Sequence, residues 1–229
     1  DILSAGVEPD GLAFNPDSIQ VERITEGADY EGVRIRFLGS LGSAKINMRI
    51  DVGFGDVVYP EPQELDLPAM LNFPAARLLC YSRESAIPKK CEAMVKSVLM
   101  SSRMKNFYDI WLLSRLFDFE GEKLTAAIRL TFERRGTKLH LKVEAFSVPF
   151  IEDKQTHWRA FCKRLSQDHA PTSFSEIAAS VDRFLSPIVE ALSSGDPRPV
   201  KWIAPGPWAW IFKISLQITI RNQGQMFEW

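Results

Sequence analysis

The chain has 229 residues, 45% of them hydrophobic, which is enough for one large domain or two small ones with a buried core. Its 28 basic and 29 acidic residues give a formal net charge of −1, which excludes a molecule-wide positive field that attracts nucleic acid. The 3 cysteines are widely spaced and the 3 histidines are scattered, which disfavours a disulfide framework or a zinc site.

The sequence contains no recognisable secretory or membrane-spanning segment. The opening residues, Asp-Ile-Leu-Ser, include neither a basic region nor a long apolar run. The most apolar late stretch, 208–220, is too short to span a bilayer and is interrupted by Lys213 and Gln217. We therefore expect a cytoplasmic protein with reduced thiols, and the missing initiator methionine suggests that Asp1 is a fragment boundary.

The first third of the chain predicts β-structure. Apolar residues alternate in 33–38 and 46–52, on either side of the glycine-rich turn 39–43, a pattern typical of an antiparallel hairpin. Residues 18–24 form a candidate third strand. The stretch 59–68 is rich in proline and acidic residues and therefore predicts a loop.

The rest of the chain shows helical periodicity. Helices are predicted over residues 84–99, 103–117, 122–135, 153–165 and 173–193. Pro88 should lie in the first turn of the first helix, which places its start near Ser85, and Gly136 should end the third. A capping box beginning at Ser173 opens the fifth helix, which Pro187 should kink.

Asp51 lies near the end of a predicted strand, beside Gly53 and Gly55. If Ile50 and Val52 face the core, Asp51 points to the opposite side of the sheet, where its carboxylate is placed to bind a metal. Polymerase-type nucleotidyl transfer uses two or three carboxylates around Mg²⁺, which binds the triphosphate and activates the attacking hydroxyl. The alternative is an ordinary exposed residue on the polar face of the sheet.

Two charged residues stand out in the predicted helices. Lys90 borders an apolar stripe, from which a lysine either reaches a phosphate or extends its stem over the core. Asp109 lies among core residues and must pair with a cation such as Lys90, Arg103 or Lys105, so a structural salt bridge and an active-site role both fit. The basic residues nearby form either a patch for a triphosphate or RNA backbone, or a solvated helix face.

A two-carboxylate motif is not complete anywhere in the sequence. Gly39-Ser40 followed by Asp51 imitates the Gly-Ser…Asp-x-Asp/Glu signature of nucleotidyltransferases. Gly53, however, stands where the second acid is required.

Three blocks of residues carry a recognisable pattern, namely 50–56 (IDVGFGD), 81–94 (YSRESAIPKKCEAM) and 102–111 (SRMKNFYDIW). In this order and spacing they resemble the nucleotidyltransferase AbiEii/AbiGii toxin family. That family has a third carboxylate on a strand, a Lys before Glu-Ala-Met on a helix, and a final Asn-Ser-Arg-x-Lys-Asp-x-Tyr-Asp-Leu block. Further similarity extends the match over about residues 1–208.

The resemblance implies a role for each candidate residue. The implied catalytic residues are Asp51 as the third carboxylate, Lys90 at the nucleotide phosphates, and Asp109 in the last motif. The implied nucleotide-binding residues are Lys90, Arg103, Lys105 and Asn106. The implied metal ligands are Asp51 and Asp56. The implied cofactors are Mg²⁺ and a nucleoside triphosphate.

The resemblance also implies an α+β fold, in which a partial polymerase-β-like nucleotidyltransferase sheet core precedes a helical region. The expected divisions are 1–75 for the remnant of this core, 76–208 for the helical domain and 209–229 for an atypical tail, in which 211–216 looks strand-like. Relatives are toxins of toxin–antitoxin or phage-defence systems, and some add nucleotides to tRNA. A cognate antitoxin and an RNA acceptor are therefore the implied partners, with no membrane and no DNA expected.

Two departures from the family pattern define the alternative functions. The family opens with a Gly-Gly/Ser turn and a strand carrying Asp-x-Asp/Glu, a segment expected to precede Asp1, and Asn106 replaces a family acid. One carboxylate cannot hold the metal ions against the charge of the triphosphate. If the first motif is supplied, we expect transfer of a nucleoside monophosphate to an RNA or protein hydroxyl. The alternatives are a non-catalytic protein that binds nucleotide, RNA or an antitoxin, and a plain interaction domain.

Overall fold

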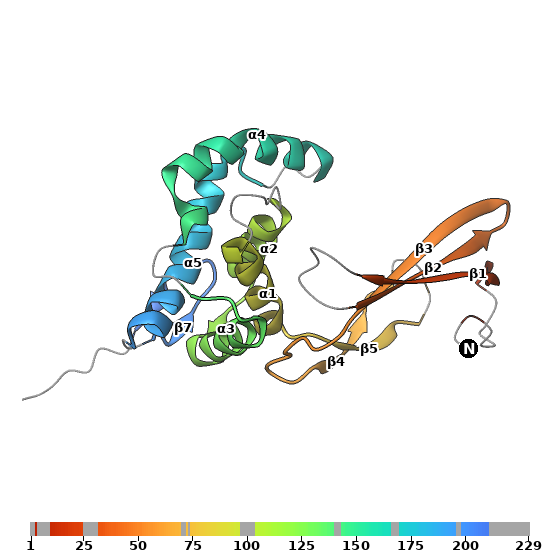
Figure 1. Ribbon diagram of the computed structural model, residues 1–229, viewed down its shortest axis with the longest axis horizontal. Coiled ribbons are helices and arrows are strands. Elements are labelled where there is room, and N and C mark those ends of the chain that lie inside the picture. The colour runs from red at the N-terminus through yellow and green to blue at the C-terminus, as the bar shows by residue number, and fades with distance from the viewer. Residues whose placement is uncertain are drawn as a thin grey trace, which may run out of the picture.

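The computed structural model describes residues 3, 10–24, 32–69, 72, 74–96, 104–139, 143–165, 170–195 and 198–210. In this part of the chain, antiparallel sheets of the first segment extend from one side of a group of helices (Figure 1). The expected α+β arrangement, with a β-rich first part followed by a helical region, is confirmed.

A three-stranded antiparallel sheet is formed by β1 (Leu12–Ile24), β2 (Gly32–Leu41) and β3 (Ala44–Gly53), in that order. The predicted hairpin is confirmed as β2 and β3, and Gly42 enables its tight turn with a φ of 57°. The candidate third strand is β1, which begins at Leu12 and not at residue 18. It pairs with β2 with a register shift in its middle.

The loop predicted for 59–68 is wrong in its second half. Residues Gln63–Leu67 form β4, which pairs antiparallel with β5 (Ala76–Cys80), and an Arg77–Glu64 ion pair of 2.8 Å joins the two strands. The prolines of this segment flank β4 and so leave its backbone donors intact. The pattern of residues 59–68 alone cannot reveal that a partner strand follows.

Five helices are present in the described residues, as the sequence predicts. They are α1 (Arg83–Lys96), α2 (Met104–Leu116), α3 (Gly121–Arg135), α4 (Val148–Leu165) and α5 (Phe174–Ser194). Helix α1 begins earlier than expected, because the N–H groups of Ser85 and Ala86 donate to the carbonyl of Ser82. Pro88 therefore lies beyond the first turn and not within it as predicted. Gly136 ends α3 with a φ of 62°, as predicted.

The start of α5 is correctly predicted, but its expected cap is wrong. The Ser173 side chain makes no capping hydrogen bond. Instead, the N–H of Phe174 donates to Oε1 of Gln155 on α4, at 2.8 Å. A residue of the neighbouring helix thus accepts the hydrogen bond from the free N–H group at the start of α5. In other helices a local capping box provides this acceptor. Pro187 lies inside α5, and the kink expected there stays a prediction.

The main hydrophobic core lies among the helices and a small sheet of β6 (Phe119–Glu120), β7 (Lys201–Trp202) and β8 (Trp208–Ala209). Its aromatic centre joins α2, α4 and α5, where Phe174 lies 4.9 Å from Phe107 between ring centroids. Fully burying such a side chain stabilises the fold by about 1.5–3 kcal/mol. The helical region therefore supplies most of the packing of the described chain.

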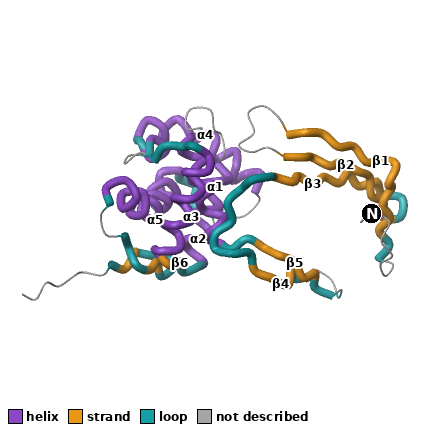
Figure 2. The backbone as a smooth tube through the Cα atoms, turned by 60° about the horizontal axis from the view of Figure 1, so that its bottom comes forward, coloured by secondary structure: helices purple, strands orange, loops and turns teal. Residues whose placement is uncertain are grey.

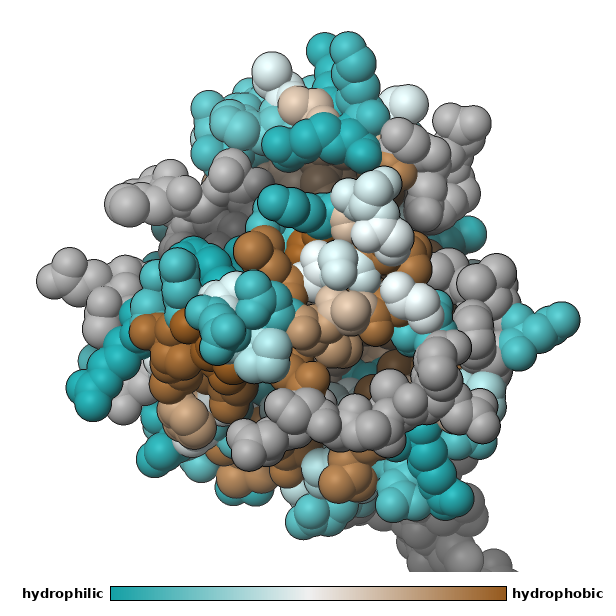
Figure 3. Space-filling view, turned by 90° about the vertical axis from the view of Figure 1, so that its right-hand side faces the viewer, coloured by the Kyte–Doolittle hydropathy of each residue, from teal (hydrophilic) through white to brown (hydrophobic). Residues whose placement is uncertain are grey.

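The three-stranded sheet is more open than its alternating sequence predicts. Ile50 and Val52, expected to face the core, are 49% and 37% exposed. Apolar residues are visible between polar ones in the space-filling view toward this end of the molecule (Figure 3). The division at residues 75 and 208 stays a prediction, and the strand-like stretch 211–216 lies outside the described residues. Within the described chain, no helix combines the length and the apolar character that crossing a membrane requires.

Candidate functional site

Two lysines share one carboxylate where α1 meets α2. Nζ of Lys90 donates to Oδ2 of Asp109 at 2.6 Å, and Nζ of Lys105 donates to both carboxylate oxygens at 2.9 and 2.7 Å. The Asp109 side chain is 15% exposed, whereas that of Lys105 is 72% exposed. We call these residues the Lys90–Asp109–Lys105 cluster. Because two cations face one anion, the cluster keeps a positive charge that is open to an anionic ligand.

The cluster has a local origin in the two helices. Lys105 and Asp109 are one helical turn apart on α2, a spacing at which opposite charges meet. Lys90 reaches them from α1, so Asp109 has the cation partners that its place among core residues requires. Asn106 lies beside Lys105 in the sequence and is half-buried. Arg103, the other residue assigned to nucleotide binding, lies outside the described residues.

Asp56 belongs to a second charged group, which joins the loop after β3 to α1 and α3. Its carboxylate accepts hydrogen bonds from Lys89 at 3.0 Å and from Arg135 at 3.1 Å. Arg135 also donates to the fully buried carboxylate of Glu92 at 2.7 Å, and the Thr137 hydroxyl donates to Glu92 at 2.5 Å. We call this group the Glu92 network.

A neighbouring backbone contact fixes the same loop. The carbonyl of Gly55 accepts a hydrogen bond from Nε of Arg134 at 3.0 Å, and Gly55 has a φ of 76°, which favours glycine. Figure 2 shows this loop in teal as it leaves β3 and runs along the helices toward β4. Two successive arginines at the end of α3 therefore anchor residues 55 and 56 to the helical region.

The Asp56 contacts predict a pH-dependent stability. Burial by itself raises the pKa of Asp56, but the hydrogen bonds from Lys89 and Arg135 outweigh it and hold the pKa below its usual value. A carboxylate with a lowered folded-state pKa contributes stability above its unfolded pKa of about 3.9, and the contribution is lost as pH falls through the folded value. Asp56→Asn should therefore lower the free energy of unfolding by about 1–3 kcal/mol at pH 7.

The stability difference between wild type and Asp56→Asn should shrink when urea unfolding is repeated at pH values falling from about 4 through the lowered folded-state pKa, because the wild-type carboxylate is protonated first in the unfolded state and only then in the folded state. Asp66→Asn, at an exposed position of β4, is the matched control and should change stability little at either pH. An Asp56→Asn difference that stays constant from pH 7 to pH 3 contradicts the assigned ion pairs.

Asp51 lies on the sheet and is bound by Arg34 of the neighbouring strand. Nε and Nη2 of Arg34 donate to its two oxygens at 2.8 and 3.0 Å, and Arg49 lies 3.7 Å away. The hydrogen bonds from Arg34 hold the pKa of the Asp51 carboxyl below its usual value. Arg34 is its direct register partner between β2 and β3, so strand pairing creates this contact. The charge of Asp51 is thus already compensated.

The described residues do not by themselves provide a complete magnesium site. Protein sites for Mg²⁺ use carboxylate oxygens, and two-metal transfer requires several of them together. In the described ranges, no group of three or more His, Cys, Asp or Glu side chains is close enough to hold a metal ion. Asp51 and Asp56 each accept hydrogen bonds from arginine. The role of both as metal ligands stays a prediction.

Two features of the site region were missed by the sequence interpretation. The sequence interpretation gives no role to Glu92, although it lies in the Glu-Ala-Met part of the second block, and it does not single out Arg135. The available signal is an acidic residue next to the buried Cys91, because a buried carboxylate requires a cation or a hydrogen-bond donor as its partner. In addition, a cavity of about 680 Å³ lies at the start of α1, but its lining does not include the Lys90–Asp109–Lys105 cluster.

Comparisons with known proteins identify the class. A family model described as nucleotidyl transferase AbiEii toxin, type IV TA system, matches residues 1–183. A match over this much of the chain shows the class of the protein, which is that of the nucleotidyl transferase toxin family. The chain belongs to the AbiEii family of type IV toxin–antitoxin systems, which confirms the resemblance of the three blocks.

One solved structure adds a distant likeness. It is a protein from H. pylori assigned provisionally as a nucleotidyltransferase, with 10% identity, a TM-score of 0.36, and coverage of 82% of this chain and 71% of that chain. At this level the likeness carries no further weight. A search of curated proteins finds no match.

Proposed function

We propose that this toxin-family protein transfers a nucleoside monophosphate from a nucleoside triphosphate to a hydroxyl group of an RNA or protein acceptor. The acceptor oxygen bonds to the α-phosphorus, the bond to the β-phosphate breaks, pyrophosphate leaves, and the hydroxyl proton passes to solvent or a base. The observation that carries the proposal is the positively charged Lys90–Asp109–Lys105 cluster in a chain of the AbiEii family.

The cluster is proposed as the triphosphate-binding part of the site. Lysine ammonium groups bind phosphate oxygens as point charges, and Asp109 holds the Lys90 and Lys105 ammonium groups on the same side of the helix pair. The carboxylates used by the reaction are not gathered in the part of the chain that the structure describes. The proposal therefore assigns nucleotide binding to α1 and α2 and keeps Asp51 as the predicted third carboxylate of the transfer step.

Membership in a type IV toxin–antitoxin family supports an antitoxin as a partner. We further propose an RNA such as tRNA as acceptor, a role in phage defence and a cytoplasmic location. These proposals rest on the family. The near-neutral chain offers only local basic patches to a polyanion.

A second candidate function is favoured by the compensated carboxylates. Asp51 is held by two hydrogen bonds from Arg34, and no metal cluster occurs among the described residues. A non-catalytic protein that binds nucleotide, RNA or an antitoxin without turnover accounts for these contacts. Both candidates use the Lys90–Asp109–Lys105 cluster for binding and differ in turnover.

The first test is triphosphate binding measured by calorimetry. Lys90→Ala should weaken binding about ten- to hundredfold, because it removes a charge-assisted contact with the phosphates. Lys96→Ala, which alters an exposed lysine in the last turn of the same helix, is the control and should bind as wild type does. Equal binding by both variants and wild type excludes a nucleotide site at this cluster.

The second test is transfer of label from α-³²P-labelled nucleoside triphosphates to RNA or protein acceptors, with pyrophosphate release measured in parallel. Stoichiometric label and pyrophosphate support the transferase, and Asp51→Asn should then abolish both signals. Lys90-dependent binding without label transfer supports the non-catalytic candidate. Transfer that persists in Asp51→Asn contradicts the role of Asp51 as third carboxylate.

A further inference from the structure

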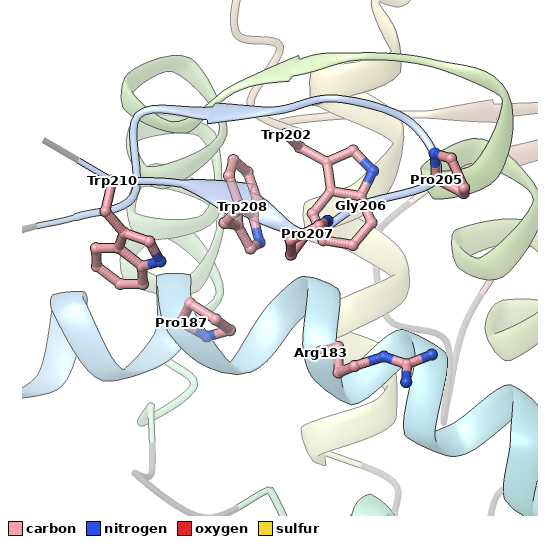
Figure 4. Close-up of a pocket in the computed structure, with 8 residues that line it drawn as sticks. All are labelled: Arg183, Pro187, Trp202, Pro205, Gly206, Pro207, Trp208 and Trp210. Atoms are coloured by element: carbon pink, nitrogen blue, oxygen red, sulfur yellow. The ribbon is translucent and has the colours of Figure 1, made fainter.

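A cleft of about 460 Å³ opens between α5 and the β7–β8 hairpin (Figure 4), and its lining includes no residue of the Lys90–Asp109–Lys105 cluster. Its lining residues are aromatic, proline or glycine with one exception, and they are Arg183, Pro187, Trp202, Pro205, Gly206, Pro207, Trp208 and Trp210. Ligand pockets in proteins usually have volumes of about 300–1,000 Å³. The cleft is therefore large enough for a small molecule with one or two rings.

The floor of the cleft is rigid because its two tryptophan side chains are buried and donate hydrogen bonds to backbone carbonyls in the protein interior. Trp202 and Trp208 are 3% and 6% exposed. Nε1 of Trp202 donates to the carbonyl of Ser114 at 2.6 Å, and Nε1 of Trp208 donates to that of Phe184 at 2.8 Å. Both indole donors point into the protein, so these two rings offer a ligand only apolar surface.

The loop between the two strands is fitted closely to this floor. A Cβ atom added to Gly206 would lie 2.4 Å from the ring of Trp202, and Gly206 has a φ of 108°. Only glycine allows both the close approach and this backbone conformation. The floor and the loop therefore form one preformed wall, which lowers the ordering cost of binding a ligand.

Two exposed groups, a flat aromatic ring and a cation, lie toward the ends of the cleft. Trp210 is 43% exposed, and Arg183 is exposed and is the only charged side chain that lines the cleft. Figure 4 shows Trp210 and Arg183 toward opposite ends of the cleft, with Pro187 between them. None of the ion pairs among the described residues includes Arg183, and its exposed side chain is accessible to a ligand from solvent.

We propose that this cleft binds a nucleotide, with the base stacked on Trp210 and a phosphate bound by Arg183. Base stacking on an exposed aromatic ring combined with arginine at a phosphate is a general mode of nucleotide and single-strand recognition. The single positive charge selects an anion, and the apolar walls select a ring. The nucleotide is either free or the terminal residue of an RNA strand.

A proline-rich peptide fits the cleft less well. Three prolines of this chain already form part of the walls. The two buried indole N–H groups donate to the carbonyls of Ser114 and Phe184 and cannot donate to a peptide carbonyl.

The cleft also lies almost wholly beyond the family match, which ends at Arg183. The proposal is thus a second site, independent of the triphosphate site on α1 and α2.

The test is a titration of the ¹⁵N-labelled full chain with adenosine monophosphate, followed through the tryptophan indole N–H signals. The Trp210 signal, assigned by its loss in Trp210→Phe, should shift on addition of the nucleotide. Trp210→Ala and Arg183→Gln should each weaken binding about tenfold, because one removes the stacking ring and the other the phosphate contact. Ribose 5-phosphate and adenosine, which each lack one of the two groups, should also bind about tenfold more weakly.

Two control variants separate this cleft from other binding modes. Arg129→Gln changes an exposed arginine of α3 that does not line the cleft, and it should leave binding unchanged. Lys90→Ala should also leave it unchanged, because Lys90 belongs to the other proposed site. If Lys90→Ala abolishes binding and Trp210→Ala does not, the cleft proposal is overturned while the triphosphate site stands.

The source of the nucleotide is resolved by a second titration with a short single-stranded RNA. Binding of the RNA alone or of the mononucleotide alone, with loss in Trp210→Ala, supports the cleft and identifies its source. Absence of a Trp210 shift with both probes at millimolar concentration overturns the proposal. A Trp210 shift with a proline-rich peptide and with neither nucleotide probe also overturns it.

Discussion

Replacing Arg135 with methionine is expected to lower the free energy of unfolding by about 3–5 kcal/mol, because it leaves the buried carboxylate of Glu92 without its cation. The Glu92 side chain is 0% exposed, and the Arg135 side chain 10%. Among the described residues, the other group in contact with this carboxylate is the hydroxyl of Thr137, which cannot neutralise its charge. Asp56 also loses one of its two cation partners in this variant.

Urea unfolding followed by circular dichroism measures this effect. Arg129→Met lies on the same helix at an exposed position and should change stability by less than about 0.5 kcal/mol. The double variant Glu92→Met with Arg135→Met removes both charges and should be more stable than Arg135→Met alone. Equal stability of Arg135→Met and wild type would show that the Glu92 network does not support the fold.

The second large effect is expected at Gly121, where a single added methyl group meets the backbone of another segment. Gly121 begins α3, and its N–H donates to the carbonyl of Val200 at 2.8 Å. A Cβ atom at this position would lie 1.8 Å from the carbonyl oxygen of Pro199. Because backbone cannot rotate away as a side chain can, Gly121→Ala should cost about 3 kcal/mol or more.

Thermal unfolding provides the measurement for Gly121→Ala. The matched control is Gly42→Ala, which places the same methyl group in the turn between β2 and β3 with no atom within 4 Å. Its φ of 57° limits the cost to about 1–2 kcal/mol. If the two variants lose equal stability, the contact between α3 and residues 199–200 is looser than the structure shows.

The Gly121 contact bears on the proposed nucleotide cleft as well. It holds residues 199 and 200 just before β7, which carries Trp202 of the cleft floor. We expect Gly121→Ala to disturb the cleft along with the fold, whereas Trp210→Ala changes only the exposed ring. The two substitutions therefore distinguish support of the cleft from contact with its ligand.

The sequence by itself determined the helices and the family. Apolar spacing located α1 to α5, and Gly136 ended α3, because helical periodicity and a left-handed C-terminal residue are local properties. The three blocks identified the AbiEii family because they combine residue type with spacing. The pairing of Asp109 with a lysine was also predictable, since Lys105 lies one turn away on the same helix.

Only the tertiary structure decided which charges are paired and which surfaces are covered. Asp51 is held by Arg34, 17 residues away, and Glu92 by Arg135, 43 residues away. Strand β4 depends on β5, the start of α5 depends on Gln155, and the cleft depends on α5 meeting the β7–β8 hairpin. Local patterns report propensity and periodicity, whereas these contacts join segments distant in sequence. Their geometry is fixed only when helices and strands pack together.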